Sequence, residues 1–183
     1  RELGRRLAED LGFEYYDREI MEQIAEHTSF SEEYIHQIVE GHRHPLYPIT
    51  INHSFNFTSD THAQMIASVY EAQSEVLRRV AELSDCVIVG RCANHVLRDR
   101  DDVLDIIIHA GLEFRLNRTI NVLGLPEKQA RKVLRSTDKA RKTYYKSHTG
   151  TDWNDPDLYH ACLNPDRLTF DGCVETICNM YQL

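Results

Sequence analysis

The spacing of hydrophobic residues predicts that helices and short strands alternate along the chain. Three leucines recur at four-residue intervals within residues 1–11, with charged residues between them, and Gly12 follows directly. This pattern predicts an amphipathic helix that ends in a left-handed turn. The aromatic run at residues 13–16 is typical of a short strand. Asp17 then stands where this strand ends and the next helix begins.

Two further apolar runs, residues 86–89 and 103–109, have the composition of strands that are buried on both faces of a sheet. In residues 42–60 the periodicity fails, and the prolines and asparagines found there predict a loop. The remaining predictions are helices over residues 18–26, 31–40, 61–83, 112–122 and 170–180, a helix opened by Pro126, a polar stretch over residues 146–157, and a last strand over residues 158–163.

Strands that alternate with helices predict an α/β fold with a parallel sheet, right-handed crossovers and helices on both faces. Ligands in such folds bind beyond the carboxyl ends of the strands. Asp17, Arg91 and Ala110 lie at the ends of predicted strands. We therefore expect these three positions to converge at one edge of the sheet.

The composition fits a single globular domain, since 42% of the 183 residues are hydrophobic and 27% are charged. A formal net charge of −8 argues against a nucleic-acid partner, because proteins that coat nucleic acid present basic surfaces. The five cysteines include no CxxC pair, which favours a reducing compartment over a disulfide framework or a zinc site. No apolar run approaches the ~20 residues of a membrane span. We therefore expect a cytoplasmic protein without a membrane partner.

The helix opened by Pro126 is the one basic segment of this acidic chain. Arg135, Asp138 and Arg141 follow one another at intervals of three residues, so they share one helical face. Two guanidiniums oriented by a carboxylate would suit a clamp on a phosphoryl group. A solvated charged face is the alternative interpretation. Five histidines between residues 36 and 62 match no ligand spacing, so no residue is assigned as a metal ligand.

Four longer runs point to a family: RELGRRLAEDLGFEYYDREIM, CVIVGRCANHVL, VLDIIIHAGLEFRLNR and DKARKTYYKSHTGTDWNDPDLYHACLN. Taken in order, they resemble the cytidylate kinase-like family of the P-loop nucleoside monophosphate kinase superfamily. The resemblance implies one P-loop kinase domain over residues 1–183, a three-layer sandwich with a parallel sheet. It also implies a helical acceptor-binding insertion at about 28–62 and a lid region at about 126–157, with the first strand and glycine loop upstream of residue 1.

The resemblance implies that the start of the first helix binds the phosphoryl donor. Arg1 falls where the phosphate-loop lysine or its replacement contacts the donor phosphates. Glu2 falls where such proteins usually place the Ser or Thr that holds magnesium. Both are therefore cofactor-binding candidates for ATP, and Arg1 is also a catalytic candidate. Glu2 is a departure from the family pattern, so the expected Mg²⁺ would be held through water or by another carboxylate. From the residues alone, a solvated helix N-terminus is an equal alternative.

The resemblance also assigns residues to the acceptor and to the lid. Asp17 resembles the aspartate near the acceptor phosphate and metal, although an ordinary N-cap is the alternative. Arg91 resembles the arginine that grips the acceptor monophosphate. The full catalytic set is Arg1, Asp17, Arg91, Arg135 and Arg141, and the substrate-binding set is Arg18, Arg91 and Asp138.

The chain also departs from classical cytidylate kinases. They carry Gly-Arg-Asp where this chain has Gly90-Arg91-Cys92, and they carry an arginine near the position of Gln23. Arg115 and Arg118 follow the strand predicted at 103–109, within reach of the adenine or the lid by the resemblance, but they are expected to be ordinary surface residues.

The predicted function is ATP-dependent phosphoryl transfer to a nucleoside monophosphate, with CMP or dCMP as the first expected acceptor. Two alternatives remain open. One is a nucleotide-binding regulatory protein with little turnover, which the departures at Glu2, Gln23 and Cys92 favour. The other is a kinase of a small non-nucleotide acceptor on the same scaffold.

Overall fold

The structure of the chain is a computed structural model, and it describes residues 1–17, 20, 22 and 59–182. Arg18, Gln23, the predicted helix at 31–40, and most of the predicted helix at 18–26, of the loop at 42–60 and of the insertion at 28–62 lie outside these residues. The first half of the described chain contains helix α1 (Glu2–Leu11), strand β1 (Glu14–Tyr16), helix α4 (Ser59–Leu83), strand β2 (Cys86–Ile88) and the short helix α5 (Ala93–Val96).

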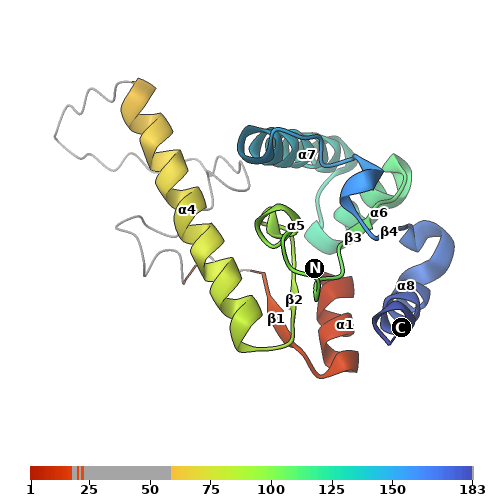
Figure 1. The fold of residues 1–183 in the computed structure, drawn as a ribbon. Coiled ribbons are helices and arrows are strands. Elements are labelled where there is room, and N and C mark those ends of the chain that lie inside the picture. Colours follow the sequence, from red (N-terminus) through yellow and green to blue (C-terminus); the bar gives the residue numbers. More distant parts are fainter. Residues whose placement is uncertain (18–19, 21, 23–58, 183) are drawn as a thin grey trace.

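The second half continues the alternation of strands and helices (Figure 1). It contains strand β3 (Ile106–Ile108), helix α6 (Leu112–Leu123), helix α7 (Glu127–Thr149), the 3₁₀ turn η1 (Pro156–Leu158), strand β4 (Ala161–Leu163) and helix α8 (Pro165–Tyr181).

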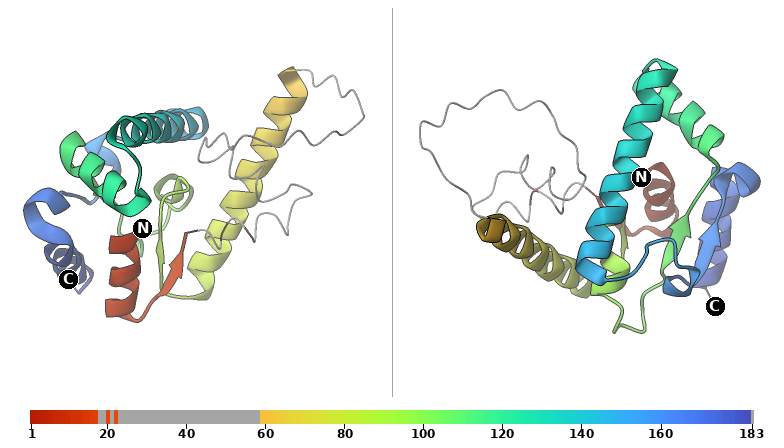
Figure 2. Two further views of the ribbon diagram at one scale, coloured as in Figure 1. Left: turned by 180° about the vertical axis from the view of Figure 1, so that it is seen from behind. Right: turned by 90° about the horizontal axis from the view of Figure 1, so that it is seen from above.

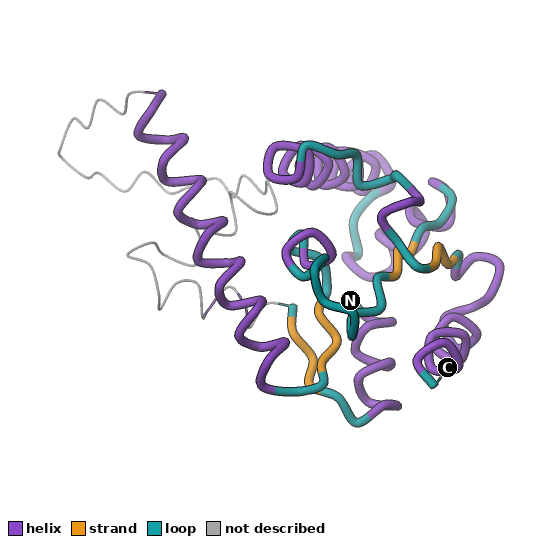
Figure 3. Tube along the Cα trace, in the orientation of Figure 1, coloured by secondary structure: helices purple, strands orange, loops and turns teal. Residues whose placement is uncertain are grey.

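The described strands form two parallel pairs, which Figure 3 shows apart from each other. β1 pairs with β2 from Glu14 opposite Cys86 to Tyr16 opposite Ile88. β3 pairs with β4 over residues 106–108 and 161–163. The prediction of an α/β fold with parallel strands is therefore confirmed.

Helices cover both faces of the β1–β2 pair. Side chains alternate between the two faces of a strand, so neighbouring strand residues contact different helices. Tyr16 and Ile88 pack against the core that contains the buried face of α4. Val87 packs on the opposite side, against the core that α1 shares with α8. Figure 1 shows the resulting order, with α4, the two strands, α1 and α8 side by side.

Most predicted helices are confirmed, with changed ends. α1 ends at Gly12, whose φ of 69° is left-handed as predicted. α7 extends to Thr149, so the first residues of the predicted polar stretch at 146–157 are helical. α8 contains one non-helical residue, Thr169, with a φ of 62°, so the helix predicted over residues 170–180 matches its longer part. A shorter turn precedes it from Pro165, where the Asn164 side chain caps the turn by accepting a hydrogen bond from the Asp166 N–H.

The predicted strands at 103–109 and 158–163 are longer than the observed ones. Asp105 donates its backbone N–H to the His160 ring at 2.9 Å, so the ladder begins only at Ile106. Residues 156–158 turn instead of extending, because Pro156 fixes its φ and the Asp155 side chain accepts from the Asp157 N–H. In both places a polar side chain accepts a hydrogen bond from a backbone N–H and limits the strand.

Candidate functional site

The ends of β1 and β2 bring three of the predicted site residues together. Asp17 follows β1, Arg91 follows β2 by three residues, and Arg1 directly precedes α1. The Asp17 Oδ2 lies 2.8 Å from the Arg1 Nε, and its Oδ1 lies 3.6 Å from the Arg91 Nη2. The predicted convergence of Asp17 and Arg91 is therefore observed, and Arg1 joins them. Ala110 follows β3, in the other strand pair.

This triad of Arg1, Asp17 and Arg91 is largely withdrawn from solvent. The side chain of Arg91 is 4% exposed and that of Asp17 is 9% exposed, whereas that of Arg1 is 39% exposed. A buried carboxylate requires paired and hydrogen-bonding cations. Asp17 therefore fixes two guanidiniums at one point, and the triad carries one net positive charge in an acidic protein.

Arg91 occupies an unusual backbone turn. Gly90, Arg91 and Cys92 have φ angles of 75°, 61° and 56°, so three successive residues are left-handed. Only glycine adopts this region without a steric cost. The Ala93 N–H donates to the Gly90 carbonyl at 3.0 Å and closes the turn. Sequence reasoning placed Arg91 at a strand end but did not predict this turn.

A second group of charges lies at the first turn of α1. Arg118 of α6 donates to the Glu2 carboxylate, which also accepts from Arg6 at 2.6 Å. The hydrogen bond from Arg118 is the largest cause that lowers the pKa of Glu2. The Arg118 guanidinium also lies 4.6 Å from the ring centroid of Phe170. Glu2, a predicted cofactor-binding residue, is thus held by two arginines.

The charges of α6 and α7 face the same region. The charged groups of Arg141 and Arg118 lie near enough to the backbone nitrogen of Arg1 to act on it electrostatically. Figures 1 and 2 both show the start of α1 beside α6, and α7 packs against α6. Arg1, Arg118 of α6 and Arg141 of α7 therefore gather near the start of α1, a surrounding that favours an anionic ligand.

The predicted lid residues do not act as one cluster. Asp138 accepts two hydrogen bonds from Arg115 of α6, at 3.1 Å and 2.8 Å, so it braces α6 against α7. We expected it instead to orient Arg135 and Arg141 on its own helical face. Arg115 is the better partner because α6 packs against α7. This packing presents the guanidinium of Arg115 to both carboxylate oxygens of Asp138.

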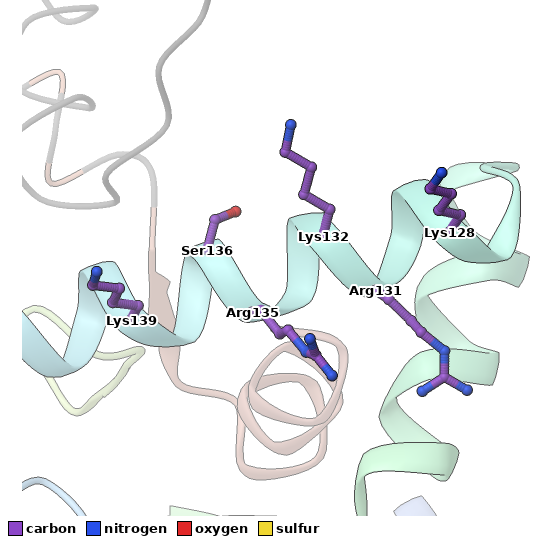
Figure 4. Close-up of a pocket in the computed structure, with 6 residues that line it drawn as sticks. All are labelled: Lys128, Arg131, Lys132, Arg135, Ser136 and Lys139. Atoms are coloured by element: carbon purple, nitrogen blue, oxygen red, sulfur yellow. The ribbon is translucent and has the colours of Figure 1, made fainter.

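The basic residues of α7 point to different sides of the helix. Figure 4 shows Arg131 and Arg135 directed to the side where α6 and α1 are seen, whereas Lys132 and Ser136 are directed to the opposite side. A pocket along the helix is lined by Lys128, Arg131, Lys132, Arg135, Ser136 and Lys139.

Sequence reasoning missed the contribution of Arg115 and Arg118, which were expected on the ordinary surface. Their spacing of three residues places them on one face of α6, and that signal was present in the sequence. Their partners Asp138 and Glu2 lie 23 and 116 residues away, which no local pattern reveals.

The acidic side chains at the start of α1 and the end of β1 are engaged by arginines. No group of three or more His, Cys, Asp and Glu side chains within the described ranges is arranged to hold a metal. Both oxygens of Asp17 face arginines, and Glu2 is paired with two more. None of the helices in the described part of the chain is long and apolar enough to cross a membrane.

Comparison with known proteins identifies the class. The model of the cytidylate kinase-like family matches residues 1–167, so the chain belongs to this family. The family name points to a nucleotide kinase, a phosphotransferase. The predicted family is thus confirmed.

The fold of this chain is similar to that of a solved structure. The crystal structure of an uncharacterized protein from Eubacterium ventriosum ATCC 27560 matches it with a TM-score of 0.70 and 20% sequence identity. The match covers 98% of this chain and 89% of that one. A search of the curated proteins gives no match.

Proposed function

We propose that the protein is an ATP-dependent kinase that transfers a phosphoryl group to a small phosphorylated acceptor, with CMP or dCMP as the first candidate. The observation that carries this proposal is the triad of Arg1, Asp17 and Arg91 at the carboxyl ends of two parallel strands. Ligand sites of α/β folds lie at such ends. A phosphate anion is the ligand that two converging guanidiniums recognise best.

In this proposal the chain folds as a P-loop kinase sandwich. Residues 126–157 form its lid, and the acceptor-binding insertion at about 28–62 lies mostly outside the described residues. The charge of Arg141 on α7 acts on Arg1 at the start of α1, and this supports the assignment of the lid. The same arrangement supports a donor site at the first turn of α1, where the helix dipole favours phosphate.

The residues divide the work of phosphoryl transfer, which depends on positioning and on stabilisation of charge. Arg91 holds the phosphate of the acceptor, and Asp17 fixes the orientation of its guanidinium. Arg1, together with Arg118 and Arg141, neutralises the phosphates of the donor. Bound magnesium would add charge neutralisation on those phosphates. Closure of α7 would bring Arg135 to the transferring group and exclude water.

The base specificity is expected to differ from that of proteins with a Gly-Arg-Asp motif. Cys92 replaces the aspartate, is 6% exposed, and precedes the first residue of α5. Burial raises the pKa of this thiol to about 12, so it stays neutral and offers no carboxylate to a ligand. This observation favours the two alternatives, a kinase of a small non-nucleotide acceptor and a regulatory nucleotide-binding protein, as the candidates to test beside CMP.

The test is an ADP-release assay on the full-length protein with Mg-ATP and a panel of CMP, dCMP, UMP, AMP and GMP. We expect strong stimulation by one monophosphate. Arg91→Ala should lower kcat/KM for that acceptor by about 10²–10⁴-fold, because a buried charge-assisted contact to phosphate is lost. The matched control is Arg98→Ala, since this arginine is 58% exposed and pairs with Asp99 on the surface.

Two outcomes would overturn the proposal. Turnover like that of the wild type in Arg91→Ala would remove this residue from the site. Binding of ATP without stimulation by any monophosphate of the panel would favour the regulatory protein or a non-nucleotide acceptor.

A further inference from the structure

The turn that carries Arg91 needs support from outside itself. A left-handed conformation is sterically unfavourable for residues other than glycine, and two such residues follow one another at Arg91 and Cys92. Strained turns of this kind persist only where the surrounding structure over-determines them. The conformation is worth holding because it places the Arg91 guanidinium, 4% exposed, beside Asp17.

The support comes from Gln73 on α4. Its Nε2 donates to the backbone carbonyl of Arg91 at 2.8 Å. Gln73 is fully buried, and it lies four residues after Val69 and four before Leu77, both of which belong to the apolar core. An amide buried in such a place destabilises the fold unless its hydrogen bonds are made. A hydrophobic residue would fit the apolar pattern of α4 better at this position. We therefore attribute the amide of Gln73 to its hydrogen bond with the turn at Arg91.

Tyr144 of α7 completes the arrangement. Its hydroxyl donates to the Gln73 Oε1 at 3.1 Å. Burial raises the pKa of Tyr144, so the phenol keeps the proton that it donates. The chemistry also fixes the orientation of the amide, since the Arg91 carbonyl can only accept and therefore requires the NH₂ group of Gln73. The Tyr144 ring is held by His148, with ring centroids 4.5 Å apart.

We propose that Gln73 and Tyr144 are positioning residues for Arg91, and that they link α7 to the grip on the acceptor phosphate. The path runs from Tyr144 through Gln73 to the backbone of Arg91, and from the Arg91 side chain to Asp17. Tyr144 lies three residues after Arg141 on the same helix. The position of the basic helix is therefore coupled to the turn that orients Arg91. The inference rests on the proposed function, in which Arg91 holds the acceptor.

The experiment compares Gln73→Met and Tyr144→Phe in the full-length protein, with CMP as the probe acceptor or the monophosphate of the panel that gives turnover. Gln73→Met keeps the volume and removes both hydrogen bonds, so the KM for the acceptor should rise about 10–100-fold. Tyr144→Phe removes one oxygen and should raise it about 3–10-fold. The KM for ATP should change less than twofold in both.

Two neighbouring residues provide matched controls. Ser74 is buried beside Gln73, but its hydroxyl donates to the Tyr70 carbonyl of its own helix at 2.8 Å. Tyr145 is buried beside Tyr144, but its hydroxyl accepts from the Asn94 side chain at 2.9 Å. Ser74→Ala and Tyr145→Phe therefore remove buried polar groups that do not touch the turn. They should leave the acceptor KM within twofold of the wild type.

A double-mutant cycle separates the link from two independent effects. If Tyr144 acts through Gln73, adding Tyr144→Phe to Gln73→Met should raise the acceptor KM no further. Should Gln73→Met fail to fold, Tyr144→Phe carries the test alone, because it deletes one atom and is compared directly with Tyr145→Phe.

The failures of the inference and of the proposed function look different. The inference is overturned if Arg91→Ala impairs the acceptor step while Gln73→Met and Tyr144→Phe only lower the unfolding temperature and keep the acceptor KM of the controls. The proposed function fails if Arg91→Ala itself leaves the acceptor KM and the turnover unchanged, and the inference then falls with it.

Discussion

Asp17 has two arginines on its two carboxylate oxygens and little contact with water. Its side chain is 9% exposed, and Arg91, at 3.6 Å, is exposed even less. Removal of one partner from a buried pair leaves an uncompensated charge, which costs much more than the loss of a surface contact. The charge of Asp17 therefore affects both stability and the orientation of Arg91.

Asp17→Asn should lower the free energy of unfolding by about 2–4 kcal/mol, because two guanidiniums lose their counter-charge while the shape of the side chain is kept. Urea unfolding of the full-length protein measures this change. The control is Asp102→Asn, since Asp102 pairs with Arg100 at 2.6 Å but is 66% exposed. That control should leave stability unchanged within error. Equal losses in the two variants would contradict the structural importance of the triad.

At the scale of elements, the packing of α1 on the strands depends on Gly4. A Cβ at this position would lie 2.9 Å from the Val89 Cγ2 and 3.3 Å from the Tyr15 Cε2. Val89 is β-branched and has little rotamer freedom, so the strand or the helix would have to move. Glycine at position 4 thus sets how closely α1 approaches β1 and β2.

Gly4→Ala should therefore lower the free energy of unfolding by about 1–3 kcal/mol through overpacking, although alanine favours the helix. Gly172→Ala is the matched variant in α8, where the new Cβ would meet the Thr169 Oγ1 at an ordinary 3.5 Å. It should raise stability by about 0.5–1 kcal/mol, because only the backbone entropy of the unfolded chain changes. Chemical denaturation of both variants checks the opposite signs; stabilisation of both would refute the close approach at Gly4.

The elements that sequence predicted best are those whose patterns are local. α1, β1, β2 and α6 follow from apolar periodicity and from glycine at their ends. α5 was missed because four residues give no period. The predicted start at residue 170 matches the part of α8 after the non-helical Thr169, and only the short turn before it was missed, although Asn164 and Pro165 are a start signal in themselves.

The same distinction applies to the candidate site. Asp17 and Arg91 could be predicted because the ends of parallel strands meet whatever the details of packing. The role of Gln73 could not be predicted, since its position in an apolar stripe shows only that an amide is buried there. Its partners are Arg91, in the turn after β2, and Tyr144 of α7. The pairs Arg115–Asp138 and Arg118–Glu2 depend on where α6 packs, which sequence order does not specify.

At the scale of the whole molecule, two cores flank the candidate site. One contains the buried residues of α4 with Tyr144 and Tyr145 of α7. The other joins α1, β4 and α8. The triad lies between them, at the ends of the strands that both cores cover. A substitution in α7 therefore alters the packing of the first core as well as the site. The free energy of unfolding is consequently sensitive to residues of α7 such as His148.

His148 lies against the Tyr70 ring, with centroids 4.1 Å apart and planes 3° from parallel, and its buried Nε2 has no hydrogen-bond partner among the described residues. Burial lowers the pKa of this imidazole below its usual value of about 6.5. As the pH falls below about 6.5, the unfolded chain binds the proton and the folded protein does not. The protein should therefore lose stability on acidification, by at most about 1.4 kcal/mol per pH unit from this group.

His148→Gln should flatten that dependence between pH 7 and pH 5.5, because the glutamine does not titrate. The comparison concerns the slope of the free energy of unfolding against pH, measured by urea denaturation at each pH, since the lost stacking also changes the absolute value. His109→Gln is the control, because His109 is exposed. His95, whose pKa burial also lowers, keeps part of the slope in both variants. If His148→Gln and His109→Gln follow the slope of the wild type equally, burial of His148 contributes nothing to the acid sensitivity of the fold.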